Sequence, residues 1–168
     1  EDITSMHDPL LMKDMDIAVS RLIESIEKKE LILIIGDYDA DGTSATSLLY
    51  LYFKSIKIDV EYYIPNRQTE GYGVSKKAID FGSKIGAKLI ITCDCGITAI
   101  EEIEYAKKYN IDVIITDHHK QGNNLPNAYA ILNPNQNECN YPFKGLCGAG
   151  VAFKLCFELN KQLGFDIN

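Results

Sequence analysis

The stretch LILIIGDYDADGT, residues 31–43, decides how the rest of the chain is interpreted. Its five leading apolar residues predict a short, fully buried strand. Asp37, Asp39 and Asp41 follow at alternate positions, and Gly42 closes the group. Three carboxylates this close together repel one another, which a fold tolerates when cations lie among them. A solvated acidic turn is the alternative, but the position directly after a buried strand favours a functional site.

The composition is that of an ordinary globular domain. The chain has 168 residues, of which 46% are hydrophobic and 24% are charged, enough to bury one core. Its formal net charge of −7 argues against a broad basic surface for nucleic acid. Much of that charge comes from aspartates at the candidate site, so an anionic substrate is still possible if metal ions or local basic residues meet its phosphates.

The number and spacing of the cysteines indicate a reducing compartment. The five cysteines are an odd number and form no C-x-x-C pair, which favours reduced thiols over a disulfide framework or a zinc site. No apolar segment approaches the roughly 20 residues that span a bilayer, and no signal-peptide pattern opens the chain. We therefore expect a cytoplasmic protein. Because the first residue is Glu1, we also expect an excised part of a longer chain.

Short apolar segments alternate with amphipathic ones along the chain. This pattern predicts an α/β fold with an open, mostly parallel, Rossmann-like sheet and helices on both faces. We expect an irregular lead-in over 1–11, a polar loop over 66–73, and a second helix capped by Thr43 or Ser44. The expected strands are 31–35, 58–64, 89–92, 113–116 and 129–132; the expected helices are 16–29, 44–56, 74–87, 97–109 and 151–163.

Three of the predicted strands end in residues that bind metals. Besides the DYDADG group, CDCG places Asp94 after one strand, and DHH places Asp117, His118 and His119 after another. The carboxyl ends of parallel strands share one edge of a sheet, so these groups should converge. Carboxylates with one or two imidazoles suit Mn²⁺ or Mg²⁺, and a pair of ions about 3.5–4 Å apart is plausible. We expect His118 to bind an ion and His119 to contact a phosphate or support the site.

Two other motif assignments compete with this one. D-x-D-x-D-G opens an EF-hand loop, but that loop needs a glutamate at its twelfth position and a preceding helix. The twelfth position from Asp37 is Leu48, and the preceding segment is a strand, so the EF-hand is excluded. DADGT at 39–43 also resembles the opening motif of haloacid-dehalogenase-like phosphatases. That assignment gives no function to Asp94 or to the trio at 117–119.

The ordered set of motifs resembles the RecJ branch of the DHH phosphoesterase family. The set extends over nearly the whole chain and comprises GDYDADG at 36–42, IPNR and EGYG at 64–73, DCGIT at 94–98, TDHH at 116–119, NP at 133–134 and CGAGVAFKL at 147–155. The lead-in HDPLLMKDMD at 7–16 resembles the same branch. Members of that branch are single-strand-specific DNA exonucleases that digest from the 5′ end.

The resemblance implies roles for individual residues. It implies metal binding by Asp39, Asp41, Asp94 and His118, with Asp94 bridging two ions. Asp37 and Asp117 would support the catalytic centre, and His119 would face the scissile phosphate. The implied substrate-binding residues are Arg67, Gly71, Tyr72, Gly73, Gly148 and Gly150. For the last two, bare amides at a helix start could receive a phosphate, while a tight turn before a packed helix is an equally good explanation.

The resemblance also implies what the piece is and does. Residues 1–168 would be one DHH catalytic subdomain, with a further metal-binding aspartate, a DHH-associated domain and an OB-fold expected downstream. We expect a Mn²⁺- or Mg²⁺-dependent 5′→3′ exonuclease that acts on single-stranded DNA in repair and recombination, the isolated piece being weak or inactive. Repair-protein partners are possible. The alternatives are another DHH phosphoesterase, acting on oligonucleotides, cyclic dinucleotides or pyrophosphate, and a catalytically silent scaffold.

Overall fold

The described residues, 6–165 of a computed structural model, form a five-stranded sheet in the order β2-β1-β3-β4-β5. All four pairings are parallel, so the sheet that we expected to be mostly parallel is parallel throughout its described strands. The strands are β1 (Ile32–Gly36), β2 (Val60–Tyr63), β3 (Leu89–Cys93), β4 (Asp112–Thr116) and β5 (Ala130–Leu132).

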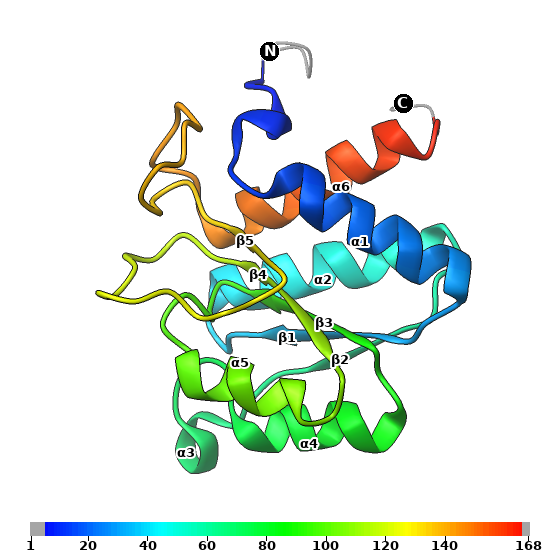
Figure 1. Ribbon diagram of the computed structural model, residues 1–168, viewed down its shortest axis with the longest axis vertical. Coiled ribbons are helices and arrows are strands. Elements are labelled where there is room, and N and C mark those ends of the chain that lie inside the picture. Colours follow the sequence, from blue (N-terminus) through cyan, green and yellow to red (C-terminus); the bar gives the residue numbers. More distant parts are fainter. Residues whose placement is uncertain (1–5, 166–168) are drawn as a thin grey trace.

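Helices cover both faces of this sheet (Figure 1). One layer contains α1 (Met15–Lys28), α2 (Ala40–Ser55) and α6 (Gly148–Gln162); the other contains α4 (Lys76–Ile85) and α5 (Ile100–Lys107), with the short α3 (Arg67–Glu70) beside it. The expected α/β architecture is therefore confirmed. Among residues 6–165, no helix combines the length and the apolar character needed to cross a membrane.

The strands read as continuous apolar runs because both of their faces are buried. In β1, Ile32 and Ile34 belong to the core beneath α1, α2 and α6, whereas Leu33 and Ile35 belong to the core on the α4 and α5 side. All four side chains are fully buried. Burial on both faces is what a parallel sheet between two helical layers requires. It holds the strand ends, and thus the acidic loop, in fixed positions.

The expected start of the second helix was wrong. Helix α2 begins at Ala40, and its cap is Asp39, whose Oδ1 accepts a hydrogen bond of 2.9 Å from the amide of Gly42. Thr43 and Ser44 lie inside the helix. Aspartate is a good helix cap, and the second half of the acidic group forms a first helical turn instead of a loop.

Two other segments also contain more structure than the sequence predicts. The lead-in includes the 3-10 helix η2 (Pro9–Leu11), and its residues 1–5 lie outside the described part. The polar loop at 66–73 includes α3, which Asn66 caps by accepting a bond from the amide of Gln68.

Candidate metal centre

The candidate centre lies where the strand order reverses. From β1 the chain goes to β2 on one side and then to β3 on the other. Asp37 follows β1, Asp94 follows β3 and Asp117 follows β4, and each of these residues is 1% exposed. Ligands of open α/β sheets bind at such switch points, outside the carboxyl ends of the strands. The predicted convergence of the three motifs is therefore observed.

Asp94 occupies the middle of this cluster in an unusual backbone conformation. Its φ of 59° is left-handed, and its amide donates to the carbonyl of Thr116 on the neighbouring strand. Burial, followed by the charge of Asp41, raises the pKa of Asp94 to about 7. Left-handed aspartates are uncommon, and strained residues of this kind gather at functional sites.

Asp94 belongs to two groups of potential metal ligands. One group consists of Asp37, Asp39 and Asp94, and the other of Asp94, His118 and His119; within each group the ligand atoms lie within 4.8 Å of one another. A carboxylate shared by two groups is the arrangement expected of a residue that bridges two ions. Asp37, which we expected in a supporting role, belongs to the same group of potential ligands as Asp39 and Asp94.

The donor atoms fit a divalent cation. Among the described residues, none completes a hydrogen bond to the buried Oδ1 of Asp94, although Nε2 of His118 lies 3.0 Å away. Neighbouring ligands of an octahedral ion with bonds of about 2.1 Å are themselves about 3 Å apart. Buried carboxylates without donors are costly unless a cation compensates them. The site therefore has both the chemistry and the spacing for Mn²⁺ or Mg²⁺.

Asp117 orients the two histidines. Its Oδ1 accepts bonds from the amides of His118 (2.7 Å) and His119 (3.0 Å) and lies 2.7 Å from Nδ1 of His119, while its Oδ2 accepts from the amide of Ile97. Burial acts to lower the pKa of His119, but the hydrogen bond and charge of Asp117 outweigh it, so the pKa is raised. Asp117 therefore stabilises the charged form of His119 relative to its neutral form.

Asp41 connects the acidic loop to the last helix. Its two oxygens accept bonds from the amides of Gly148 (2.7 Å) and Ala149 (2.8 Å) at the start of α6. Burial acts to raise the pKa of Asp41, but these amides, together with the Cys147 side chain, lower it overall. Oδ2 of Asp41 also lies 3.6 Å from Nε2 of His118. The carboxylate of Asp41 therefore lies beside the site and also interacts with the N-terminus of α6. Its predicted role as an ion ligand stays a prediction.

The two glycines of α6 have different neighbours. A Cβ at Gly148 would lie 2.6 Å from Cβ and from Oδ1 of Asp94, so only glycine lets the helix approach this carboxylate. The amide of Gly148, for which a phosphate contact and a tight turn were both open, donates to Asp41. The atoms nearest to a Cβ at Gly150 would belong to the side chains of Leu146 and Cys147. Packing therefore explains Gly148, whose amide is already bonded, and a phosphate contact at Gly150 stays a prediction.

Tyr72 lies in the site as the sequence analysis expected. Its hydroxyl donates to the backbone carbonyl of Asp94 and lies 3.3 Å from Nδ1 of His119, and its ring meets the imidazole edge to face. Gly71 and Gly73, on either side, have φ values of 79° and 80°, which glycine adopts without strain. Arg67 begins α3, and its side chain lies outside what the structure describes.

Three residues that position this site were not singled out from the sequence. The Glu70 carboxylate accepts bonds from the Tyr63 hydroxyl, the Asn66 amide, the Ser75 hydroxyl and the Lys77 ammonium, and so anchors the loop that carries Tyr72. Asn133 and Asn135 bond to the backbone of the histidine pair. Glu70 and Asn133 lie in the EGYG and NP motifs, which were the available signals.

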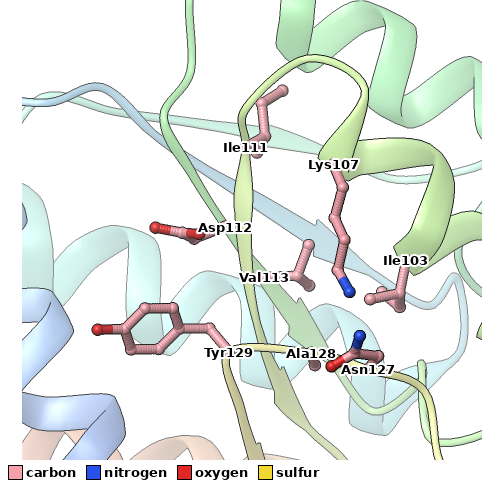
Figure 2. Close-up of a pocket in the computed structure, with 8 residues that line it drawn as sticks. All are labelled: Ile103, Lys107, Ile111, Asp112, Val113, Asn127, Ala128 and Tyr129. Carbon is pink, nitrogen blue, oxygen red and sulfur yellow. The ribbon is translucent and has the colours of Figure 1, made fainter.

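A separate pocket of about 240 Å³ lies at the opposite end of the strands (Figure 2). Asp112 and Tyr129 point away from Lys107 and Asn127 there. Lys107 pairs with Glu104, and Asp112 pairs with the buried Arg21. Because the charged groups of this pocket are already paired with other residues, we assign metal binding to the centre around Asp94.

Comparisons with known proteins agree with this geometry. The family described as DHH family, N-terminal domain, matches residues 31–167. The single-stranded-DNA-specific exonuclease RecJ of Bacillus subtilis is 46% identical over 157 residues, covering 94% of this chain and 20% of that protein. RecJ of Escherichia coli is 42% identical over 147 residues, covering 87% of this chain and 26% of that protein.

A solved structure is similar over the same region. The crystal structure of exonuclease RecJ bound to manganese superposes with a TM-score of 0.84 at 33% identity, covering 92% of this chain and 39% of that one. The chain thus spans about a fifth to a quarter of the length of the two curated relatives. The match over residues 31–167, together with the converging DYDADG, CDCG and DHH groups, shows that the chain belongs to the DHH family.

Proposed function

We propose that this chain is the metal-binding catalytic part of a hydrolase that degrades single-stranded DNA from its 5′ end. The observation that carries the proposal is the shared position of Asp94 between the Asp37–Asp39 group and the His118–His119 group. The exonuclease RecJ of B. subtilis, at 46% identity, supports the substrate, and the RecJ structure bound to manganese supports the ion. Mg²⁺ suits the same oxygen-rich set.

The residues of the centre would have different roles in the reaction. Asp39, Asp94 and His118 would hold the ions, with Asp37 close enough to contribute a further oxygen. The bound ions would supply an activated water and stabilise the negative charge that develops at phosphorus. His119, kept in position by Asp117, would donate a hydrogen bond to a non-bridging phosphate oxygen.

The left-handed backbone at Asp94 and the close approach of α6 would keep the carboxylates from relaxing apart. Preorganisation of this kind is how a site stabilises charge without reorganising during the reaction. Asp41 would hold α6 against the site, and Tyr72 would hold the exposed edge of His119.

The setting of the activity is part of the proposal. The two curated relatives are much longer than this chain, and we propose that full activity needs additional domains and a further carboxylate. We further propose a role in DNA repair and recombination in the cytoplasm. All five cysteines are unpaired in the structure, which fits a reducing compartment.

The test uses the longest available form of the protein with end-labelled single-stranded DNA and Mn²⁺. We expect mononucleotides to be released from the 5′ end, and the activity to disappear in Asp94→Ala. Asp59→Ala, which removes an exposed carboxylate away from the site, is the matched control and should leave the rate unchanged. Hydrolysis of dinucleotides but not of long DNA would instead identify another phosphoesterase, and absence of both activities would favour a silent scaffold.

A further inference from the structure

The loop after β5 holds the backbone carbonyls of the histidine pair, whose amides are held by Asp117. Asn133 directly follows β5 and is completely buried. Its Nδ2 donates a 2.9 Å bond to the carbonyl of His119, and Nδ2 of Asn135 donates a 2.6 Å bond to the carbonyl of His118. The side-chain oxygen of Asn133 accepts a 2.7 Å bond from the amide of Asn135, so the two asparagines form one unit.

The histidine pair is therefore fixed on all four of its backbone groups. Both amides donate to Asp117, and both carbonyls accept from an asparagine side chain. Strand β4 ends at Thr116, so no sheet partner is provided for these groups. Successive residues of a strand point to opposite faces, yet the rings of His118 and His119 lie 4.5 Å apart. A non-strand backbone must be held in place to keep both rings in the same site.

The asparagines are themselves anchored. Nε2 of Gln136 donates to the carbonyl of Ile131, and Nζ of Lys144 donates to the carbonyls of Pro134 and Cys139. The loop can thus transmit a fixed position to the histidines. Partners behind metal ligands orient those ligands, and their loss weakens metal binding or activity by about 10–100-fold.

We infer that Asn133 and Asn135 are positioning residues for the catalytic centre, which set the two imidazoles at the distances that metal binding and phosphate contact require. Asn135 acts through His118, the predicted ion ligand, and Asn133 acts through His119. The inference deepens the proposed function and rests on it for the roles of the histidines, but it concerns two asparagines to which the sequence analysis gave no role.

The test measures Mn²⁺ binding directly, by electron paramagnetic resonance of the unbound ion, with the full-length protein. In Asn135→Ala we expect the dissociation constant for Mn²⁺ to rise by about 10-fold or more. Asn135→Asp keeps the shape but cannot donate, and its added charge would by itself tighten cation binding. If both variants bind Mn²⁺ more weakly, the cause is therefore the loss of the Nδ2 donor of Asn135. Asn137→Ala removes an exposed amide from the same loop and is the control.

Thermal unfolding of the same samples separates positioning from a purely structural role. A structural role would lower the melting temperature and leave Mn²⁺ affinity of the folded protein unchanged, and that result would overturn the inference. Asn135 is only partly buried, so we expect its variants to fold, and their Mn²⁺ affinities are enough to distinguish positioning from a structural role. The same measurement on Asn133→Asp tests the asparagine that bonds to His119. Wild-type protein that binds Mn²⁺ but leaves single-stranded DNA intact would refute the proposed function without affecting this binding test.

Discussion

Replacing Gly148 by alanine tests how closely α6 must approach Asp94. The new Cβ would lie 2.6 Å from Oδ1 of Asp94, against an ordinary contact of 3.4 Å or more. Asp94 cannot retreat freely, because its amide is bonded to Thr116. The start of α6 must therefore move away from the site, and its bonds to Asp41 must lengthen.

The magnitude follows from two opposing effects. Alanine favours a helix over glycine by up to about 1 kcal/mol, whereas overpacking a well-filled site costs about 1–3 kcal/mol. We expect Gly148→Ala to lower the free energy of unfolding by about 1–2 kcal/mol. The longer bonds would also release Asp41, whose Oδ2 lies 3.6 Å from Nε2 of His118, and this should weaken Mn²⁺ binding by about 10-fold.

Gly150→Ala is the matched control on the same helix. Its Cβ would lie 2.6 Å from Cδ1 of Leu146, but this side chain is only partly buried and can rotate away. We expect the control to be as stable as the wild type or slightly more stable, with unchanged Mn²⁺ affinity. Urea unfolding and Mn²⁺ titration of both variants provide the measurement. If Gly148→Ala is as stable as Gly150→Ala and binds Mn²⁺ equally well, the close approach does not constrain the site.

Three further predictions concern other parts of the molecule. Arg21→Met should destabilise the fold by about 3 kcal/mol in urea unfolding, because Glu30 and Asp112 lose their buried partner; an unchanged midpoint would contradict this. Burial acts to raise the pKa of Glu70, but its hydrogen bonds lower it overall, so its anchoring of the 66–73 loop is present above the ordinary glutamate pKa and is lost as the pH falls. Limited proteolysis should show that loop opening at acidic pH, and Glu70→Gln should remove the pH dependence. Asp41→Asn should lower the free energy of unfolding by about 2 kcal/mol at neutral pH, because one carboxylate oxygen that accepts an amide of α6 is replaced by an NH₂ group and the negative charge is lost. Equal stability of the variant and the wild type in urea unfolding would refute this.

The sheet could be predicted from the sequence because its strands are buried on both faces and so appear as uninterrupted apolar runs. The meeting of Asp37, Asp94 and Asp117 followed from the shared edge of parallel strands. The start of α2 could not be predicted, because Asp39 serves both as a helix cap and as a potential ligand, and an acidic group followed by glycine is more typical of a loop.

The contacts behind the ligands could not be predicted for a different reason. Asp41 meets the amide of Gly148 across 107 positions of sequence, and Asn135 meets His118 across 17. These pairings depend on how α6 and the loop after β5 pack against the sheet edge. No local pattern specifies that packing, and an aspartate suited to binding an ion is equally suited to capping a helix.

Anomalous diffraction at the manganese edge, from crystals of the full-length protein soaked in Mn²⁺, tests the central claim most directly. We predict two peaks about 3.5–4 Å apart. One should lie towards Asp37 and Asp39 and the other towards His118 and His119, and both should contact the Asp94 carboxylate. A single ion that leaves Asp94 free, or ions found only at the pocket beside Asp112, would contradict the account.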